Sequence, residues 1–464
     1  MKSAVRNFLS LLSADIVRRL LGFISVAYLA RVLGTEGFGA INIGYAVLSV
    51  GIMVSAMGLT AVGAREIAHG APDDLAGDIV SLRLAISAVV VVLICVISFV
   101  FVEDSSTAWV VMIFSVSVFA YAVLMEWYFL GKEDVNVMAV GRVSSPALNV
   151  LLLLLFVRSS DEILWVPVAA VLGDFLFAFI LLRKHRLKAG RLNLRFRPET
   201  WRALLRQSVP VGLGYIFAQV TVNFPPLVLA FLMTKSDVGI FSAASKIVFY
   251  LLMVDRVLAP LLLPALTRWQ GMSSDLLARQ TSEVLRWLIL VGLPIAVGGM
   301  MLAQPIVDLV FGSDYSAAAG VLRVFVWFFF LTIINSVYAT SLLALGHNKV
   351  FGKVMFISAA IYVFAVTLLT MAFETIGTAF GIVFAEGITL VLLHVRLERF
   401  ATVVRPKSVG KMMTATAVMA AVVGFSFSFH FLIAILVGAI VYGGAVLAMR
   451  AVTTQEILNL VRKA

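Results

Sequence analysis

Long apolar stretches separated by short polar gaps make up most of this chain of 464 residues. A helix rises about 1.5 Å per residue, so each stretch is long enough to cross a hydrocarbon core of about 30 Å. The stretches are continuously apolar, whereas barrel strands would show about ten residues of alternating polarity. The sequence therefore predicts an all-α polytopic membrane protein with about 14 transmembrane helices, at 8–30, 38–63, 79–102, 108–130, 138–157, 163–182, 207–233, 239–266, 284–303, 318–345, 350–372, 376–395, 411–428 and 431–449.

The composition excludes an ordinary soluble domain. Apolar residues make up 62% of the chain and charged residues 13%, against about a quarter charged in a typical soluble domain. The net charge of +11 lies beside membrane segments, where anionic headgroups attract it, so no nucleic-acid partner is expected. Cys95 is the single cysteine and the five histidines are isolated, so no metal site and no organic cofactor are expected.

Positive charge falls in every second gap between the apolar stretches. With the N-terminus in the cytoplasm, 27 of the 36 Lys and Arg lie in cytoplasmic gaps and tails or, for Arg142, Arg286, Lys353 and Lys411, near the cytoplasmic ends of the spans beside them, and the outer gaps hold only Arg31, Arg158 and Lys235. Cytoplasmic loops retain Lys and Arg, so this bias predicts cytoplasmic termini for a multi-pass protein of the plasma (inner) membrane. Lys2 and Arg6 precede an apolar stretch without a clear cleavage site, which indicates an uncleaved first span.

An internal repeat indicates two related halves. Residues 29–39 and 229–239 both begin with Leu-Ala and end with Gly, at an offset of 200 residues, and each segment joins one apolar stretch to the next. Six helices per half is an even number, which predicts two parallel six-helix bundles, related by an axis along the membrane normal, around a central cavity.

A basic segment with nine Lys and Arg in 183–206 separates these halves. At its end, Trp201, Leu204 and Leu205 share one side of a predicted helix, which is typical of an amphipathic helix on the inner membrane interface. The predicted organisation is an N-terminal lobe at 1–183, a basic cytoplasmic linker at 184–206, a C-terminal lobe at 207–400, and two additional transmembrane helices with a cytoplasmic tail at 401–464.

Five segments, in this order, resemble the Wzx-type flippases of polysaccharides and lipid-linked oligosaccharides: Tyr28–Gly39, Gly63–Ala68, Glu126–Gly131, Val238–Lys246 and Leu302–Gly312. These flippases belong to the multidrug/oligosaccharidyl-lipid/polysaccharide (MOP) exporter superfamily. The resemblance implies a V-shaped, cationic cavity that moves an anionic, polyprenyl-linked saccharide from the inner to the outer leaflet. The saccharide differs from member to member. Membrane lipids and polysaccharide polymerase or assembly proteins are the further partners expected.

Bases inside the spans are the candidate substrate site, because a charge at the centre of a span costs at least about 2.5 to 3.5 kcal/mol unless it is paired or lines a cavity. Asp15 can pair with either Arg18 or Arg19 on one helix face, which leaves one Arg over. We expect Arg18, Arg19, Lys246 and Arg256 to bind a phosphate or pyrophosphate; a structural salt bridge is the alternative for each. Two other bases near span ends, Arg83 and Arg323, are expected to extend to the headgroups.

Carboxyl groups and prolines within the spans offer two further roles. Asp15, Asp174, Asp255 and Glu386 could exchange H⁺ or bind Na⁺ as a coupling ion, or serve only as structural hydrogen-bonding groups. Proline removes a backbone donor and bends a helix. Pro210, Pro225 and Pro226 therefore mark the seventh span as a candidate gate, with a fixed kink as the alternative.

Two other functions compete with flipping. A drug/cation antiporter of the same superfamily would favour acidic cavity walls, whereas the deep charges here are mostly basic. A membrane-embedded saccharide polymerase or ligase would need catalytic residues on a sizeable outer loop, and no outer gap in this sequence is long enough to form one. The sequence therefore predicts a transporter and not an enzyme.

Overall fold

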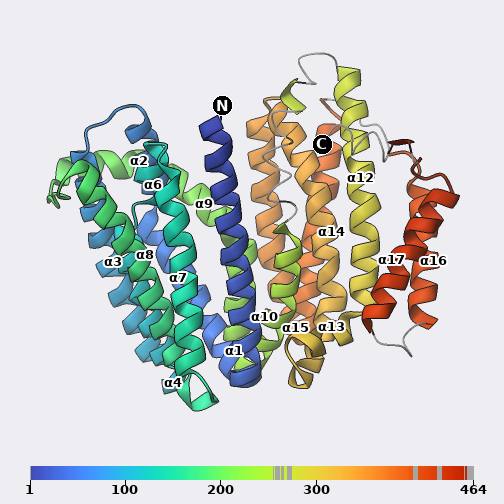
Figure 1. Cartoon of the computed structure of the whole chain (residues 1–464), viewed down its shortest axis with the longest axis horizontal. Coiled ribbons are helices and arrows are strands. Elements are labelled where there is room, and N and C mark those ends of the chain that lie inside the picture. The colour runs from blue at the N-terminus through green and yellow to red at the C-terminus, as the bar shows by residue number, and fades with distance from the viewer. Residues whose placement is uncertain are drawn as a thin grey trace. The chain divides into compact units, whose positions relative to one another are not determined.

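The computed structural model describes residues 2–253, 255, 262, 266–268, 274–400, 406–425, 431–453 and 455–456, which are helical with short connections (Figure 1). The helices are α1 (Lys2–Ala56), α2 (Leu59–Ala68), α3 (Asp74–Phe101), α4 (Ser105–Ser115), α5 (Ser117–Val123), α6 (Glu126–Gly131), α7 (Val135–Phe156), α8 (Trp165–Ala189), α9 (Pro198–Leu232), α10 (Lys235–Leu251), α12 (Ser274–Met301), α13 (Ala303–Val310), α14 (Ser316–Ala344), α15 (Asn348–Leu397), α16 (Val409–Phe425) and α17 (Phe431–Ala448).

Nine helices among the described residues are long and apolar enough to cross a membrane, and the two bent parts of α9 together would make a tenth. Two of the nine, α1 and α15, each join two predicted spans, although α1 ends at Ala56 and the predicted span 38–63 continues into α2. The polytopic, all-α character is therefore confirmed. The number fourteen stays a prediction, partly because the second half of the predicted span 239–266 lies largely outside the described residues.

Both long helices change direction between their two predicted spans. In α1 the change occurs at Gly34, whose φ of 64° lies in the region that glycine adopts without strain. In α15 it occurs at Phe373 and Glu374, where Glu374 takes a φ of 55°. The predicted outer gaps after residues 30 and 372 are therefore tight turns.

The chain forms two compact units, Met1–Gly239 and Ile240–Ala464. In the first, α7 packs on α8 and α1, and a buried core joins α2, α3 and α6 around Trp127 and Phe129. Trp201, Leu204 and Leu205 at the start of α9 pack against this same core. The apolar side of the predicted interfacial helix is thus covered by protein. The lobe boundaries drawn from the repeat remain predictions.

The basic segment before α9 is fixed to the same unit. Arg195 forms an ion pair with Asp74 at 2.7 Å, and Arg197 with Asp78 at 3.4 Å, both on α3. The Ser81 hydroxyl also donates a hydrogen bond to the Arg195 carbonyl at 2.8 Å. The linker segment around Arg195 and Arg197 is therefore held against α3 of the N-terminal unit.

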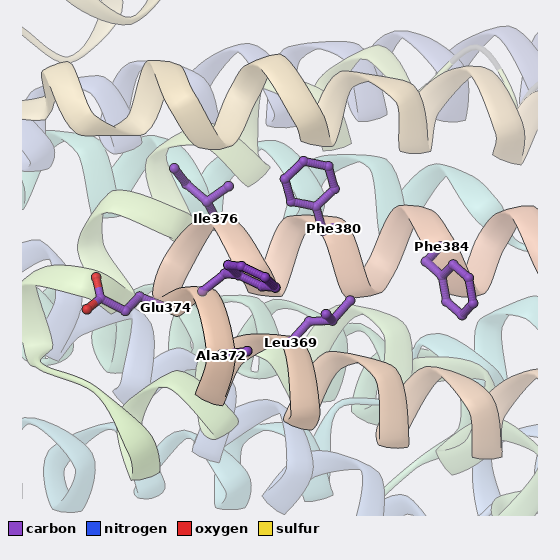
Figure 2. Close-up of a pocket in the computed structure, with 7 residues that line it drawn as sticks. Leu369, Ala372, Glu374, Ile376, Phe380 and Phe384 are labelled. Carbon is purple, nitrogen blue, oxygen red and sulfur yellow. The ribbon is translucent and has the colours of Figure 1, made fainter.

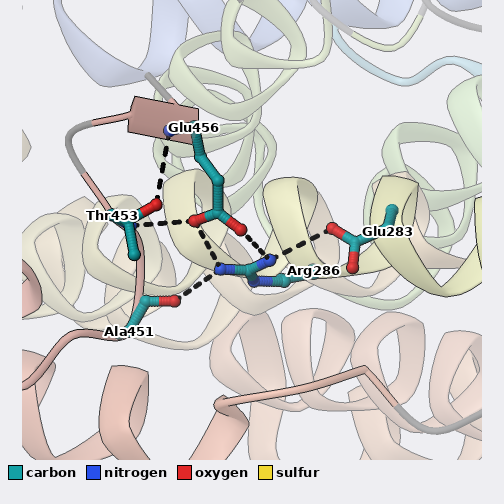
Figure 3. Close-up of polar contacts among 5 residues, drawn as sticks. All are labelled: Glu283, Arg286, Ala451, Thr453 and Glu456. Carbon is teal, nitrogen blue, oxygen red and sulfur yellow. Dashed lines mark hydrogen bonds and ion pairs between the residues drawn. The ribbon is translucent and has the colours of Figure 1, made fainter. Parts of the chain in front are cut away.

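The second unit is held together at its end by a buried arginine (Figure 3). In it, α14 packs on α12 and α15, and α16 packs on α12 and α17. Arg286 of α12, only 7% exposed, donates from its two terminal nitrogens to the two carboxylate oxygens of Glu456 at 3.1 and 3.2 Å. It also donates to the Ala451 carbonyl at 2.6 Å. The segment after α17 is thereby tied to α12.

Candidate functional site

A charged cluster lies on the first half of α1. Arg18 Nη2 is 3.1 Å from Asp15 Oδ1, and Arg19 Nε is 2.7 Å from Asp15 Oδ2. The expectation that one Arg is left unpaired is therefore wrong, because each carboxylate oxygen accepts from a different guanidinium. The cluster still carries one excess positive charge, and the Arg18 side chain is 49% exposed.

The fold brings this cluster near a carboxyl group from another helix. Asp174 of α8 lies beside the hydroxyl groups of Ser117 and Tyr121 on α5. Tyr121 in turn lies within electrostatic range of Arg18 and of Tyr45. Three helices, α1, α5 and α8, therefore surround one polar region inside the N-terminal unit. It contains both a base and a carboxyl group that the sequence had indicated separately.

Arg83 does not extend to the headgroups, and that prediction is wrong. Its side chain on α3 is 3% exposed, and Nη2 donates to the Tyr121 carbonyl at 2.5 Å. A longer contact of 3.5 Å reaches the Leu124 carbonyl, where α5 has ended and α6 has not yet begun. The Tyr121 carbonyl also accepts the Leu124 amide at 3.3 Å, and carbonyls in the last turn of a helix carry partial negative charge that attracts a cation. Two backbone carbonyls at the break between α5 and α6 therefore take the place of water around the Arg83 guanidinium.

Glu126 at the start of α6 has a specific partner in addition to its place in an aromatic segment. Arg142 Nε of α7 donates to Glu126 Oε1 at 2.7 Å, and both side chains are about 30% exposed. The sequence had indicated this glutamate only as part of the segment Glu126–Gly131. Arg142, sixteen residues later and near the cytoplasmic end of the next predicted span, was the signal in the sequence that could have indicated this ion pair.

In the C-terminal unit, Glu386 of α15 is held by neutral donors from α14. Its Oε1 accepts from Asn335 Nδ2 at 2.8 Å and from the Thr332 hydroxyl at 3.2 Å. Asn335 Nδ2 also contacts the Glu386 carbonyl at 3.1 Å, and Asn335 Oδ1 is buried without a hydrogen-bond partner in the described part of the chain. Asp255 lies within electrostatic range of Glu386. This places together two of the four carboxyl groups expected to couple an ion.

The two predicted bases of the C-terminal half have different outcomes. Lys246 is partly buried on α10 and makes no ion pair with a carboxylate of the described residues. Arg256 lies outside the described residues. The expectation that Lys246 and Arg256 act together with Arg18 and Arg19 on one anion is therefore still a prediction.

Arg323, expected to extend to the headgroups, lies on the exposed side of α14, two turns from its start.

The candidate gate helix α9 is bent by 68° between Ile216 and Thr221. None of the three prolines lies at the bend itself. Pro225 and Pro226 cannot donate to the carbonyls four residues earlier, at Thr221 and Val222, which adjoin the bend. The proline pair is therefore placed to weaken the helix there, whereas Pro210 lies in the straight first part.

A groove of about 600 Å³ lies at the break of α15 (Figure 2). Glu374 lines it together with six apolar side chains, among them the exposed rings of Phe373, Phe380 and Phe384. It contains none of the predicted site residues. Among the described residues, no group of three or more His, Cys, Asp or Glu is arranged to hold a metal ion.

Sequence comparison decides the family. The sequence profile of the family described as "Polysaccharide biosynthesis protein" matches residues 4–270, which is more than half of the chain. The chain belongs to this family. The resemblance to Wzx-type flippases of the MOP superfamily, drawn from five short segments, is thereby confirmed.

Two relatives of this polysaccharide biosynthesis protein have curated names. A putative O-antigen transporter of Shigella dysenteriae is 20% identical over 396 residues, which are 84% of this chain and 98% of the relative. A probable low-salt glycan biosynthesis flippase, Agl15, of Haloferax volcanii is 21% identical over 261 residues, 54% of each protein.

Solved structures share the fold of this family member. The lipid II flippase MurJ in an inward closed conformation covers 94% of this chain, with 97% of its own chain matched, a TM-score of 0.80 and 16% identity. An inward-facing multidrug resistance MATE transporter of the MOP superfamily covers 84%, with 98% of its own chain, a TM-score of 0.65 and 15% identity. At such identities the likeness shows the fold alone.

Proposed function

We propose that this protein is a flippase that moves an anionic polyprenyl-(pyro)phosphate-linked oligosaccharide from the cytoplasmic to the outer leaflet by alternating access, for export of a cell-surface polysaccharide. The Asp15–Arg18–Arg19 cluster is the observation that carries the proposal. It retains a net positive charge within a predicted span, and the half-exposed Arg18 has donors that Asp15 does not occupy. A guanidinium binds phosphate oxygens through two parallel hydrogen bonds.

The proposed topology places 14 spans in the plasma (inner) membrane with both termini in the cytoplasm. Two parallel bundles of six helices enclose the cavity, and α16 and α17 follow them. The alternation of positive charge supports this orientation. Polysaccharide polymerase or assembly proteins are the partners expected in this proposal.

A coupling ion drives transport in this proposal. Asp174, beside Ser117 and Tyr121, and Glu386, beside Asn335 and Thr332, are carboxyl groups within predicted spans without an arginine or lysine partner among the hydrogen bonds described. Either group can take up H⁺ or Na⁺ at lower cost than it can remain charged in the bilayer. The names of the relatives, a transporter and a flippase, support transport over polymerase or ligase chemistry.

The decisive experiment measures movement of a fluorescent polyprenyl-pyrophosphate oligosaccharide between leaflets of proteoliposomes. We expect Arg18→Ala to slow translocation at least about ten-fold, which corresponds to about 1.4 kcal/mol of lost stabilisation along the path. Arg323→Ala is the matched control, because it removes an exposed arginine from a predicted span end. Equal rates for the two variants would contradict the proposed anion site.

A further inference from the structure

The two segments of the internal repeat touch each other through equivalent glycines. A methyl group at Gly39 would overlap the Lys235 carbonyl oxygen and lie 3.1 Å from the Gly239 amide nitrogen. A methyl group at Gly239 would overlap the Thr35 carbonyl oxygen and lie 3.2 Å from the Gly39 amide nitrogen. The contact is reciprocal at the repeat offset of 200 residues. Only glycine lets the two backbones come this close.

Polar contacts surround this glycine pair. The Ser236 hydroxyl donates to Thr35 Oγ1 at 2.9 Å, and Lys235 Nζ is 3.0 Å from Asp104 Oδ2. These residues lie at the turn between the two parts of α1, at the start of α10 and just before α4. We name Gly39, Gly239, Thr35 and Ser236 the outer contact, because the charge pattern places this end of the helices outside.

A second backbone contact forms near the other end of the same predicted span. A methyl group at Gly212 of α9 would lie 2.5 Å from the Met57 carbonyl carbon and 2.9 Å from the Gly58 amide nitrogen. Met57 and Gly58 form the break between α1 and α2, where both have positive φ. Nearby, Arg65 donates to Gln207 at 3.3 Å. Met57, Gly58, Ser208 and Gly212 are the inner contact.

The spacing of the two contacts matches the membrane. Gly39 and Gly58 are 19 residues apart, which is about 28 Å along a helix. The hydrocarbon core is about 30 Å thick, so the contacts stand at opposite faces. Helix α1 therefore meets the start of α10 at one face and the first part of α9, at Ser208 and Gly212, at the other, and both contacts are closed in this structure.

We propose that the outer and inner contacts are the two closures of the translocation path, and that Gly39, Gly239 and Gly212 are the positioning residues that let each closure form. The inference rests on the proposed alternating-access function and goes beyond it by assigning the closures to residues. Each closure must open in turn, and a methyl group at either glycine pair holds one closure open.

The test is a reversible cross-link across the outer contact. In a Cys95→Ser background, Thr35→Cys and Ser236→Cys place two thiols where the hydroxyl oxygens are 2.9 Å apart, and both glycines stay in place. We expect an oxidant to form the disulfide, to reduce translocation at least about ten-fold, and a reductant to restore it. Gly39→Ala or Gly239→Ala lowers the disulfide yield several-fold in the same background, whereas Gly212→Ala does not lower it.

Gly214→Ala is the matched control, since a methyl group at Gly214 meets nothing within 4 Å. Unimpaired translocation by the cross-linked protein would overturn the proposal, as would equal disulfide yields for Gly39→Ala and Gly214→Ala. The cross-linked pair keeps the test valid if an alanine variant fails to fold. The disulfide yields need no substrate, so a native protein that moves no lipid-linked saccharide would contradict the proposed function and not the closures.

Discussion

Two carboxylates within predicted spans, Asp15 in the N-terminal unit and Glu386 in the C-terminal unit, are stabilised in different ways. In the N-terminal unit, the carboxylate of Asp15 is bound by two arginines, and the cluster keeps a positive charge. In the C-terminal unit, the carboxylate of Glu386 is bound by an amide and a hydroxyl group. Two arginines neutralise the charge of Asp15, so this carboxylate does not need to bind a proton. The neutral donors at Glu386 do not neutralise its charge, so this carboxyl group can bind a proton or a cation. This difference is the basis for proposing an anion site at Asp15, Arg18 and Arg19 and a coupling-ion site at Glu386.

Among the predicted substitutions, those at Glu386 are expected to have the largest effect on translocation. We expect Glu386→Ala to abolish the dependence of translocation on an ion gradient and to slow translocation at least about ten-fold. It also removes the carboxylate that accepts from Asn335 and Thr332, which costs about 1 to 3 kcal/mol of stability, although Asn335 keeps its contact with the backbone carbonyl of residue 386. Translocation under imposed Na⁺ or pH gradients and thermal unfolding in detergent measure the two effects.

Two variants separate stability from coupling at this position. Glu386→Gln keeps an acceptor for both donors, so its unfolding temperature stays near that of the native protein while the ion dependence is lost. Glu374→Gln removes an exposed carboxylate from the same helix and serves as the control. If Glu386→Gln retains full ion dependence, the C-terminal unit does not hold the coupling site.

A smaller effect is expected from Asp15→Asn. The change removes the carboxylate that neutralises one of two arginines, so binding of a short-chain polyprenyl pyrophosphate tightens about three- to ten-fold, and release slows. Titration of the detergent-solubilised protein measures the affinity. Asp308→Asn, which removes an exposed carboxylate from α13, is the control. Weaker binding by Asp15→Asn would show that the carboxylate orients the arginines rather than competing with the ligand.

The smallest effect concerns pH and the end of the C-terminal unit. Hydrogen bonds from Arg286 and from the Thr453 amide hold the pKa of Glu456 at about 2, below its ordinary value of 4.5. A lowered pKa in the folded state means that the contact stabilises the fold above about pH 4.5 and loses this effect as the pH falls toward 2. Glu456→Gln should flatten thermal stability between these pH values, and Asp161→Asn, in an exposed turn, should not.

Much of the fold could be predicted from the sequence. Continuous hydrophobicity located the membrane helices, because a helix in lipid satisfies its own backbone and requires only an apolar surface. The direction changes at Gly34 and Glu374 fell in predicted gaps, and the repeat that relates Gly39 to Gly239 was visible as a spaced identity. The close approach of these two glycines was not predicted, since a repeat shows equivalence and not contact.

The candidate site was less predictable. Spacing along one helix correctly placed Asp15 near Arg18 and Arg19, because residues three and four apart share a face. It could not place Tyr121 beside Asp174, or Asn335 beside Glu386, since these partners come from other helices. Arg83 shows the limit most clearly, because its carbonyl partners lie at a helix break that no local pattern indicated.

The amino-acid sequence alone shows that this chain is a polytopic membrane protein with Lys and Arg concentrated in alternate gaps and with the segments of a polysaccharide biosynthesis family. Hydropathy and charge suffice for these properties, because each residue contributes to them independently of its neighbours in space. The tertiary structure was needed to show that Arg83 contacts backbone carbonyls, which partners Glu386 has, and that Gly39 and Gly239 are in backbone contact. The cost of a buried charge and the fit of two backbones both depend on atoms contributed by helices distant in the chain.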